Sequence, residues 1–288
     1  MGRPILLNVT RRSLIRASIV GGFTAAFGEA RKIRVGCQAN AWPLKEGDFD
    51  QLIHVIETMK KLGYIGFECN IRFVRGEFAH PGEARKRSEA TSVQFIGAHM
   101  SMELASEGDF SKLAGGAMSL GAGYIVMSAA GLSPDGRFSP EALRAKAQRV
   151  EALAKICRRS GIQLAYHNHT AEFANGNAEI DGLADHTDPE LVHFLMDAGH
   201  GYQGGGDPAV FMLRHSKRIV GCHIKTFRDK ITQVPLGQGD FGFEALASAI
   251  KKTNWTGWLI DEEGGGRKDG DSAAVGQDRQ YIRRIFGA

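Results

Sequence analysis

The segment Ile162-Gln163-Leu164-Ala165-Tyr166-His167-Asn168-His169 carries the pattern on which the fold prediction rests. Its first five residues are mostly apolar, as in a short buried β-strand, and three polar side chains follow without a gap. A helical stretch precedes it. That stretch opens with the cap Ser139 and a proline at the first helical position, and Gly161 ends it. The segment therefore predicts a helix, a buried strand and then a polar strand end.

The same short apolar run occurs eight times along the chain. The other seven runs are Ile33–Cys37, Tyr64–Cys69, Gln94–His99, Tyr124–Ser128, Val192–Asp197, Ile219–Ile224 and Gly257–Glu262. Successive runs start 27 to 38 residues apart, which is the length of a strand, a helix and two loops. Eight similar units favour a closed (β/α)8 TIM barrel in the α/β class over a doubly wound open sheet, which seldom needs so many. We expect one barrel domain over residues 31–288.

Helical spacing between the runs supports this alternation. Apolar residues recur at helical intervals from Leu52 to Leu62, and Asp207-Pro208 opens a further helix. The pattern also predicts helices over residues 243–252 and 272–286. The segment Glu83–Thr91 is the weakest helix candidate because it is very polar.

The first 30 residues have the order of an export signal. A basic stretch with Arg11 and Arg12 precedes an apolar run of about 11 residues, and the small residues Gly28 and Ala30 flank Glu29. The paired arginines resemble a twin-arginine signal, so residues 1–30 predict transport to the periplasm. A basic helix with an accidental arginine pair is the alternative. No stable membrane anchor is expected after processing.

Charge and cysteine content exclude several functional classes. The chain of 288 residues has a formal charge of +4, but 32 basic and 31 acidic residues remain once residues 1–30 are removed. A nearly neutral body argues against a nucleic-acid partner. Cys37, Cys69, Cys157 and Cys222 lack metal-site spacing and are expected as buried thiols, with a Cys37–Cys69 disulfide less favoured.

Each predicted strand ends in a polar residue. These residues are Gln38, Glu68, His99, Ser128, His167, Asp197, His223 and Glu262. In a TIM barrel the carboxyl ends of the strands converge at one opening, where catalytic groups lie. Buried charges there need a partner or a metal. Polar ends on all eight runs therefore indicate an active site.

Four of these residues form a candidate metal site, namely His167, Asp197, His223 and Glu262, on four consecutive predicted strands. Imidazole and carboxylate groups suit divalent ions such as Mn²⁺, Zn²⁺ or Co²⁺. Because side chains alternate along a strand, Lys225 shares a face with His223, and Asp261 faces away from Glu262. His169 likewise shares a face with His167 and is a candidate substrate contact.

The chain resembles the xylose isomerase-like barrel superfamily, in particular its sugar phosphate isomerase/epimerase group. The resemblance covers nearly all of residues 33–286. It is carried by the segments Gly66–Glu68, Gly97–His99, Leu164–Phe173, Met196–His200, His223–Lys225, Pro235–Asp240 and Gly257–Glu262.

The resemblance implies one divalent metal, with Mn²⁺ favoured and Zn²⁺, Co²⁺ or Mg²⁺ as alternatives. Members of this group usually hold the metal with glutamate, aspartate, histidine and glutamate. The last three match Asp197, His223 and Glu262, but His167 stands where the first glutamate is usual. In the isomerases and epimerases the two glutamates move protons as a pair. Here the second base would have to come from Lys225, His99, Glu68 or Glu172.

These observations predict a metal-dependent isomerase or epimerase that acts on a sugar or sugar-like polyol through an enediolate. Glu262, His167 and Lys225 are the expected catalytic residues. His99, His169, Glu68 and Trp42 are the expected substrate contacts, and Phe73, Tyr202 and Phe227 could also stack on a sugar. The alternatives are a metal-dependent lyase or dehydratase on a keto-sugar, and a non-catalytic carbohydrate-binding barrel. A small-molecule sugar is the expected partner, and a homo-oligomer is left open.

Two further patterns are given little weight. Residues 237–242 match G-x-G-x-x-G, but they follow Pro235 in the seventh connection and are interpreted as an active-site loop rather than a dinucleotide site. The DNA-cutting endonuclease branch of the superfamily needs more zinc ligands and a basic surface. The near-neutral body and the export signal argue against it.

Overall fold

The computed structural model describes residues 32–288 apart from residue 105 and residues 264–271. The predicted signal segment, residues 1–30, lies outside the described residues. Its boundary with the barrel domain therefore stays a prediction.

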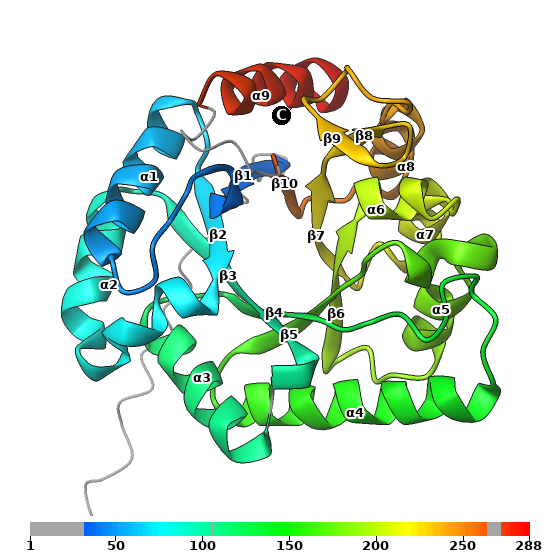
Figure 1. The fold of residues 1–288 in the computed structure, drawn as a ribbon, viewed down its shortest axis with the longest axis horizontal. Helices are drawn as coiled ribbons and strands as arrows, with labels where there is room; N and C mark the ends of the chain where they lie inside the picture. The colour runs from blue at the N-terminus through cyan, green and yellow to red at the C-terminus, as the bar shows by residue number, and fades with distance from the viewer. Residues whose placement is uncertain (1–31, 105, 264–271) are drawn as a thin grey trace, which may run out of the picture. The chain divides into compact units, whose positions relative to one another are not determined.

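Eight parallel strands close into a barrel at the centre of the molecule (Figure 1). The closure is made by β10 (Trp258–Asp261), which pairs with β1 (Arg34–Gln38) on one side and β7 on the other. The remaining strands are β2 (Gly66–Asn70), β3 (Gln94–Ser101), β4 (Tyr124–Ser128), β5 (Gln163–His167), β6 (Val192–Asp197) and β7 (Ile219–Ile224). The predicted (β/α)8 barrel is confirmed, and each of the eight apolar runs overlaps one strand.

Helices surround the strands on the outside (Figure 1). They are α1 (Phe49–Lys61), α2 (Pro81–Ala90), α3 (Glu107–Ser119), α4 (Pro140–Arg159), α5 (Ala174–Asp185), α7 (Pro208–His215), α8 (Glu244–Thr253) and α9 (Ser272–Phe286). The Ser139 side chain accepts a hydrogen bond from the Ala142 amide, as the cap at the start of α4 predicted. The polar candidate forms α2, which begins at Pro81 and buries only Ala84 and Ser88.

The barrel interior is filled by apolar side chains below the strand ends. These are Ile96, Val126, Ala165, Leu195, Trp258 and Ile260. Space beside the Trp258 ring is made by Gly66, where an added Cβ would lie 2.6 Å from that ring. Because this layer fills the barrel interior, the polar groups that point inward gather at the opening formed by the carboxyl ends of the strands, called the mouth here.

Short segments at the strand ends shape the mouth. Four strands lead into the 3₁₀ turns η1 (Ala39–Ala41), η2 (Ile71–Phe73), η4 (Met102–Leu104) and η5 (Ala171–Phe173), and η3 (Arg75–Ala79) follows η2. The strand β6 leads directly into the short helix α6 (Ala198–Gln203).

A small hairpin after β7 was not predicted. It pairs β8 (Thr226–Arg228) with β9 (Thr232–Val234) through a turn in which Asp229 and Lys230 have positive φ. Its strands have only three residues each and are partly polar, so they carry no hydrophobic pattern that could reveal them. The hairpin places Phe227 beside the mouth.

All four cysteines are free and buried, as predicted. Among the described residues, we find no helix with the length and apolar character needed to span a bilayer.

Candidate active site

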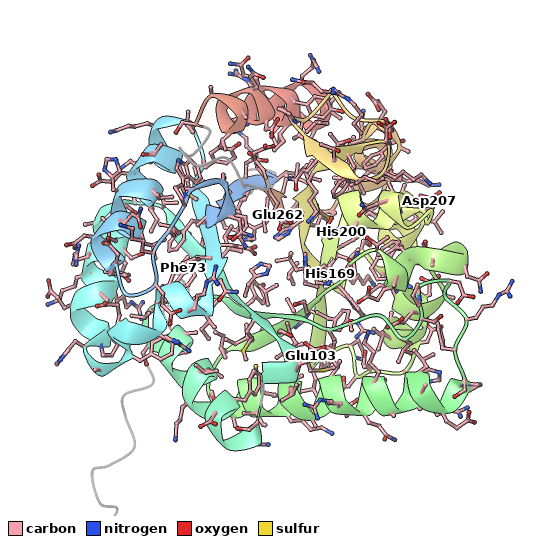
Figure 2. All side chains as sticks on the ribbon, in the orientation of Figure 1. Phe73, Glu103, His169, His200, Asp207 and Glu262 are labelled. Carbon is pink, nitrogen blue, oxygen red and sulfur yellow. The ribbon has the colours of Figure 1, made fainter. Side chains whose placement is uncertain are left out.

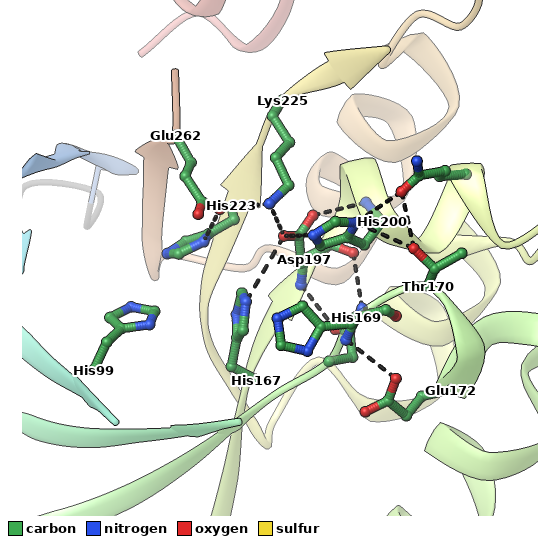
Figure 3. Close-up of polar contacts among 12 residues, drawn as sticks. His99, His167, His169, Thr170, Glu172, Asp197, His200, His223, Lys225 and Glu262 are labelled. Carbon is green, nitrogen blue, oxygen red and sulfur yellow. Dashed lines mark hydrogen bonds and ion pairs between the residues drawn. The ribbon is translucent and has the colours of Figure 1, made fainter. Parts of the chain in front are cut away.

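The four predicted ligands come together at the mouth (Figure 3). One ligand atom from each of His167, Asp197, His223 and Glu262 lies within 4.8 Å of the others. They come from the ends of β5, β6 and β7 and from the residue after β10. Asp197 and His223 are paired neighbours on β6 and β7, so both side chains point to the same face. The first three side chains are buried, and Glu262 is nearly so.

His223 lies between two carboxylates. Its Nδ1 is 2.6 Å from Glu262 Oε2, and its Nε2 is 2.7 Å from Glu68 Oε2. Glu68 Oε2 also lies 2.7 Å from His99 Nε2. Burial would lower the pKa of His223, but the two carboxylates outweigh it and raise the pKa to about 10. Burial likewise raises the pKa of Glu68, and His99 and His223 lower it to below its usual value.

Lys225 lies between the carboxylates of Asp197 and Glu262. Its Nζ lies 2.7 Å from Asp197 Oδ2 and 2.9 Å from Glu262 Oε2. Burial alone would raise the pKa of Glu262. The positive charges of Lys225 and His223 outweigh burial and hold that pKa well below its usual value. The carboxylates raise the pKa of Lys225 in the same way, against burial. Glu262 is therefore ionised at neutral pH, the form that binds a cation or accepts a proton.

Asp197 is held by backbone contacts that leave one oxygen for the cluster. Its amide donates to Asn168 Oδ1 at 2.8 Å, and its Oδ1 accepts from the His200 amide at 2.8 Å. Its buried Oδ2 accepts no hydrogen bond of good geometry from any described residue, although Lys225 is close. This arrangement aims Oδ2 into the cluster.

The donor set fits the divalent metal that the resemblance implies. Burial lowers the pKa of His167 well below its usual value, so the ring is neutral, which is the form that coordinates metals. Two imidazoles and two carboxylates suit Zn²⁺, Mn²⁺ or Co²⁺ better than the all-oxygen site that Mg²⁺ prefers. The hydrogen bond from His223 Nε2 to Glu68 would orient that ring, as outer contacts commonly do around metals.

His200 is a site residue that the sequence-based set left out. It lies on α6, with Nε2 3.8 Å from Asp197 Oδ2 and Nδ1 2.9 Å from Gln203 Oε1. Its ring stacks on Phe227 at 5.5 Å. The signal was present as Asp197-x-x-His200, because three residues make about one helical turn and bring the two side chains to one side.

The predicted substrate contacts occupy different parts of the mouth. Glu68 is buried beside His99, whereas His169 is exposed, with its ring 5.2 Å from that of His200. Figure 2 places His169 and His200 near Glu262 at the centre of the barrel. Trp42 is half-buried, and its Nε1 donates to Ser272 Oγ at the start of α9, at 3.4 Å. The substrate-binding roles of these residues stay predictions.

Glu172 is wrong as a candidate base. It is fully buried, its Oε1 accepts from Tyr166 at 2.9 Å, and its Oε2 accepts from the His169 amide at 3.1 Å. Lys146 Nζ lies 3.7 Å away. Glu172 therefore holds the backbone that follows β5 and does not face the mouth.

The aromatic candidates are mainly anchors for the loops. Phe73 and Phe227 are buried, and Tyr202 packs against Phe241 at 5.0 Å between ring centres. The expectation that Asp261 faces away from Glu262 is confirmed, because Asp261 Oδ2 accepts from Tyr64 on the outer side of the barrel at 2.6 Å.

Curated relatives and solved structures are similar to this chain. The inosose dehydratase of Clostridium tetani is 27% identical over 143 residues, covering 43% of this chain and 48% of the relative. The chain thus spans about half the length of that relative. The inosose dehydratase of Mesomycoplasma hyopneumoniae is 27% identical over 294 residues, covering 89% of this chain and 97% of the relative.

Solved structures share the fold, and two of them illustrate it. A sugar phosphate isomerase/epimerase from Parabacteroides distasonis has a TM-score of 0.68 and 20% identity, over 87% of this chain and 97% of its own. The IOLI protein with a bound zinc atom has a TM-score of 0.67 and 14% identity, over 88% and 98%. The family model for the xylose isomerase-like TIM barrel matches residues 109–285, more than half of the sequence. The chain belongs to the xylose isomerase-like TIM barrel family.

Proposed function

We propose that this chain is a divalent-metal-dependent lyase that removes water from a keto-sugar or a cyclic keto-polyol. The observation that carries the proposal is the cluster of His167, Asp197, His223 and Glu262 around one point at the mouth. The inosose dehydratases among its relatives support elimination, so the isomerase or epimerase favoured by the sequence becomes the second candidate. Zn²⁺, Mn²⁺ and Co²⁺ are the ions to test.

The bound metal would polarise the substrate carbonyl and make the neighbouring C–H more acidic. Glu262 is placed to accept that proton, because Lys225 and His223 hold it ionised beside the cluster. The paired charges keep Glu262 ionised before it accepts the proton. Proton removal is therefore assigned to the carboxylate of Glu262.

The leaving hydroxyl needs a proton from a second group. His200 is placed to supply one, because its Nδ1 lies 2.9 Å from Gln203 Oε1 and its Nε2 lies at the mouth, 3.8 Å from Asp197 Oδ2. The C–H proton then resides on Glu262, a C=C bond forms, and the C–O bond breaks with release of water. Glu262, which follows β10, and His200 on α6 thus act as base and acid.

Isomerisation or epimerisation remains the second candidate because of Glu68. This carboxylate and His99 form a second proton-handling pair on β2 and β3, on the other side of His223. Such a pair could return a proton to a different carbon or face. His167 has no carboxylate, so the usual two-glutamate arrangement is absent from the four ligands.

The test is a screen of inososes and keto-sugars in D₂O with protein loaded with Mn²⁺, Zn²⁺ or Co²⁺. A lyase gives an unsaturated product that absorbs in the ultraviolet. An isomerase or epimerase gives deuterium in recovered sugar without that absorbance. Failure to see either with any metal would refute both candidates and favour the non-catalytic binding barrel. The Asp197→Ala variant is the negative control.

We also propose that residues 1–30 export the protein to the periplasm. The paired residues Arg11 and Arg12 support this. Replacing both with lysine should leave the protein in the cytoplasmic fraction. Unchanged fractionation would contradict the proposal.

A further inference from the structure

A cavity lies at the carboxyl ends of β2 and β3. Its volume is about 660 Å³, within the range of about 300–1,000 Å³ that ligand pockets occupy. None of the four candidate metal ligands, nor Lys225 or His200, lines it. Its polar lining includes Asn70, Arg72, Arg75, Ser101, Asp109 and Lys112.

Strand geometry puts this cavity next to the Glu68–His99 pair. Asn70 follows Glu68 by two positions on β2, and Ser101 follows His99 by two positions on β3. Residues two apart on a strand share a face, so Asn70 and Ser101 continue the inner face beyond the pair. The labelled Phe73, the last residue of η2, marks this side of the barrel in Figure 2. A ligand that extends past His99 along this face would meet Asn70 and Ser101, which line the cavity.

The charges around the cavity largely balance. Arg75 forms an ion pair with Glu46, and Lys112 Nζ lies 3.8 Å from Asp109 Oδ1. The Arg72 guanidinium stacks on the Phe73 ring at 4.7 Å and has no ion pair within the described part of the chain. Only one cation is thus left without a carboxylate. This balance does not favour a phosphate, which usually needs several unpaired cations.

The lining instead combines the contacts that a sugar ring needs. Arg72 and Lys112 offer donors, Asp109 offers acceptors, and the Asn70 amide can supply both. The Ser101 hydroxyl donates to Glu103 and can accept a hydrogen bond from a ligand. Asn70 Oδ1 accepts from the Arg72 amide at 3.1 Å, which orients the amide group. Apolar side chains of Ile71, Met100 and Leu113 also line the cavity and can pack on the C–H face of a ring. A purely apolar ligand would not need the polar groups of this lining.

We propose that this cavity is a subsite for a second sugar ring, so that the substrate is a glycoside whose reacting ring lies at the metal site. The inference rests on the proposed function, because it assumes that a sugar reacts at the mouth. It assigns Arg72 as the main polar contact to the second ring. The relatives' named substrate, an inosose, has a single ring, so the subsite would separate this chain from them in specificity.

Binding of stable sugars to the metal-loaded protein tests the subsite without turnover. The probes are maltose, cellobiose, trehalose and lactose, with D-glucose and myo-inositol as single-ring controls, measured by titration calorimetry. At least one disaccharide should bind about tenfold more tightly than D-glucose. Arg72→Ala and Lys112→Ala should each reduce that advantage, and neither should change D-glucose affinity. Arg85→Ala, an exposed arginine paired with Glu89 on α2, is the matched control.

The outcomes separate the subsite from the proposed reaction. A disaccharide advantage that depends on Arg72 supports the subsite even if the keto-sugar screen finds no turnover. Turnover of single-ring keto-sugars with equal affinity for one and two rings overturns the subsite and leaves the reaction intact. An advantage that survives in both variants, or no binding of any of these sugars, also overturns it. Melting temperatures of the variants show whether each is folded.

Discussion

The two faces at the end of β10 place neighbouring carboxylates in opposite environments. Glu262 points into the mouth, where Lys225 and His223 lower its pKa well below the usual value against the effect of burial. Asp261 points outward, where burial first, and Asp278 second, raise its pKa well above the usual value. Its main partner there is the neutral Tyr64 hydroxyl, which donates to Oδ2 at 2.6 Å.

The comparison shows that position relative to cations, and not residue type, decides the charge of a buried acid. Both carboxylates lose water, which favours the protonated form. Only Glu262 has two cationic neighbours, Lys225 and His223, whose attraction outweighs the loss of water. The inner face can therefore hold an ionised base and a metal ligand, while the outer face holds a protonated acid with a structural role.

Replacing Glu262 and Asp261, each by its amide, should give the largest difference between the two faces, measured as loss of turnover. Glu262→Gln removes the proposed base and a candidate metal ligand, so turnover of any substrate found should fall by roughly 10²–10⁴-fold. Asp261→Asn resembles the protonated acid and should change turnover by less than about fivefold. Steady-state kinetics on both variants checks this. Equal losses would mean that the inner and outer faces do not differ in function.

Loss of the Asp197 carboxylate should remove the metal. We expect about one transition ion per chain in the purified, reconstituted protein by plasma mass spectrometry, and at least about 100-fold weaker binding in Asp197→Ala. The reason is that Asp197 Oδ2 is aimed into the cluster and has no hydrogen-bond partner of good geometry among the described residues. Asp181→Ala, which removes an acid paired with Arg214 on the outside, should bind metal normally. Wild-type protein that binds none of the three ions would contradict the site.

On the outer face we expect the smallest of the three effects, a change in how the stability of the protein depends on pH. Burial and the Glu263 carboxylate raise the pKa of Asp278 to about 7, although the Leu236 amide donates to Asp278 Oδ1 at 2.6 Å and opposes the shift. Asp261, Tyr64 and Cys37 are further titratable groups that interact with it. The folded state then binds more protons than the unfolded state between pH about 4 and 7.

The stabilising contribution of protonated Asp278 is thus present at low pH and is lost as pH rises through about 7. Asp278→Asn should remove roughly 1–3 kcal/mol of this pH dependence from the free energy of unfolding. Urea denaturation of both proteins at pH 5 and pH 8 measures it. Parallel pH dependence in wild type and variant would show that Asp278 does not titrate with folding.

Much of the inner face could be predicted from sequence. The strand ends His167, Asp197, His223 and Glu262 were identified because a parallel barrel brings the carboxyl ends of its strands to one opening. The opposite orientation of Asp261 followed from alternation along a strand. His200 was missed because it lies beyond the strand, on a helix too short to be recognised from periodicity. Glu172 was misjudged because a polar residue near a strand end can point outward to buried partners such as Tyr166.

The amino-acid sequence by itself determined the eight-unit barrel, the rim on which chemistry can occur and the residue types available there, because these depend on local periodicity and spacing. Only the tertiary structure decided which groups touch. His223 lies between Glu68 and Glu262, and Lys225 lies between Asp197 and Glu262, across up to 155 positions of sequence. Charge states and the cavity beside His99 depend on such contacts, since electrostatic effects fall with distance in space and not with separation along the chain.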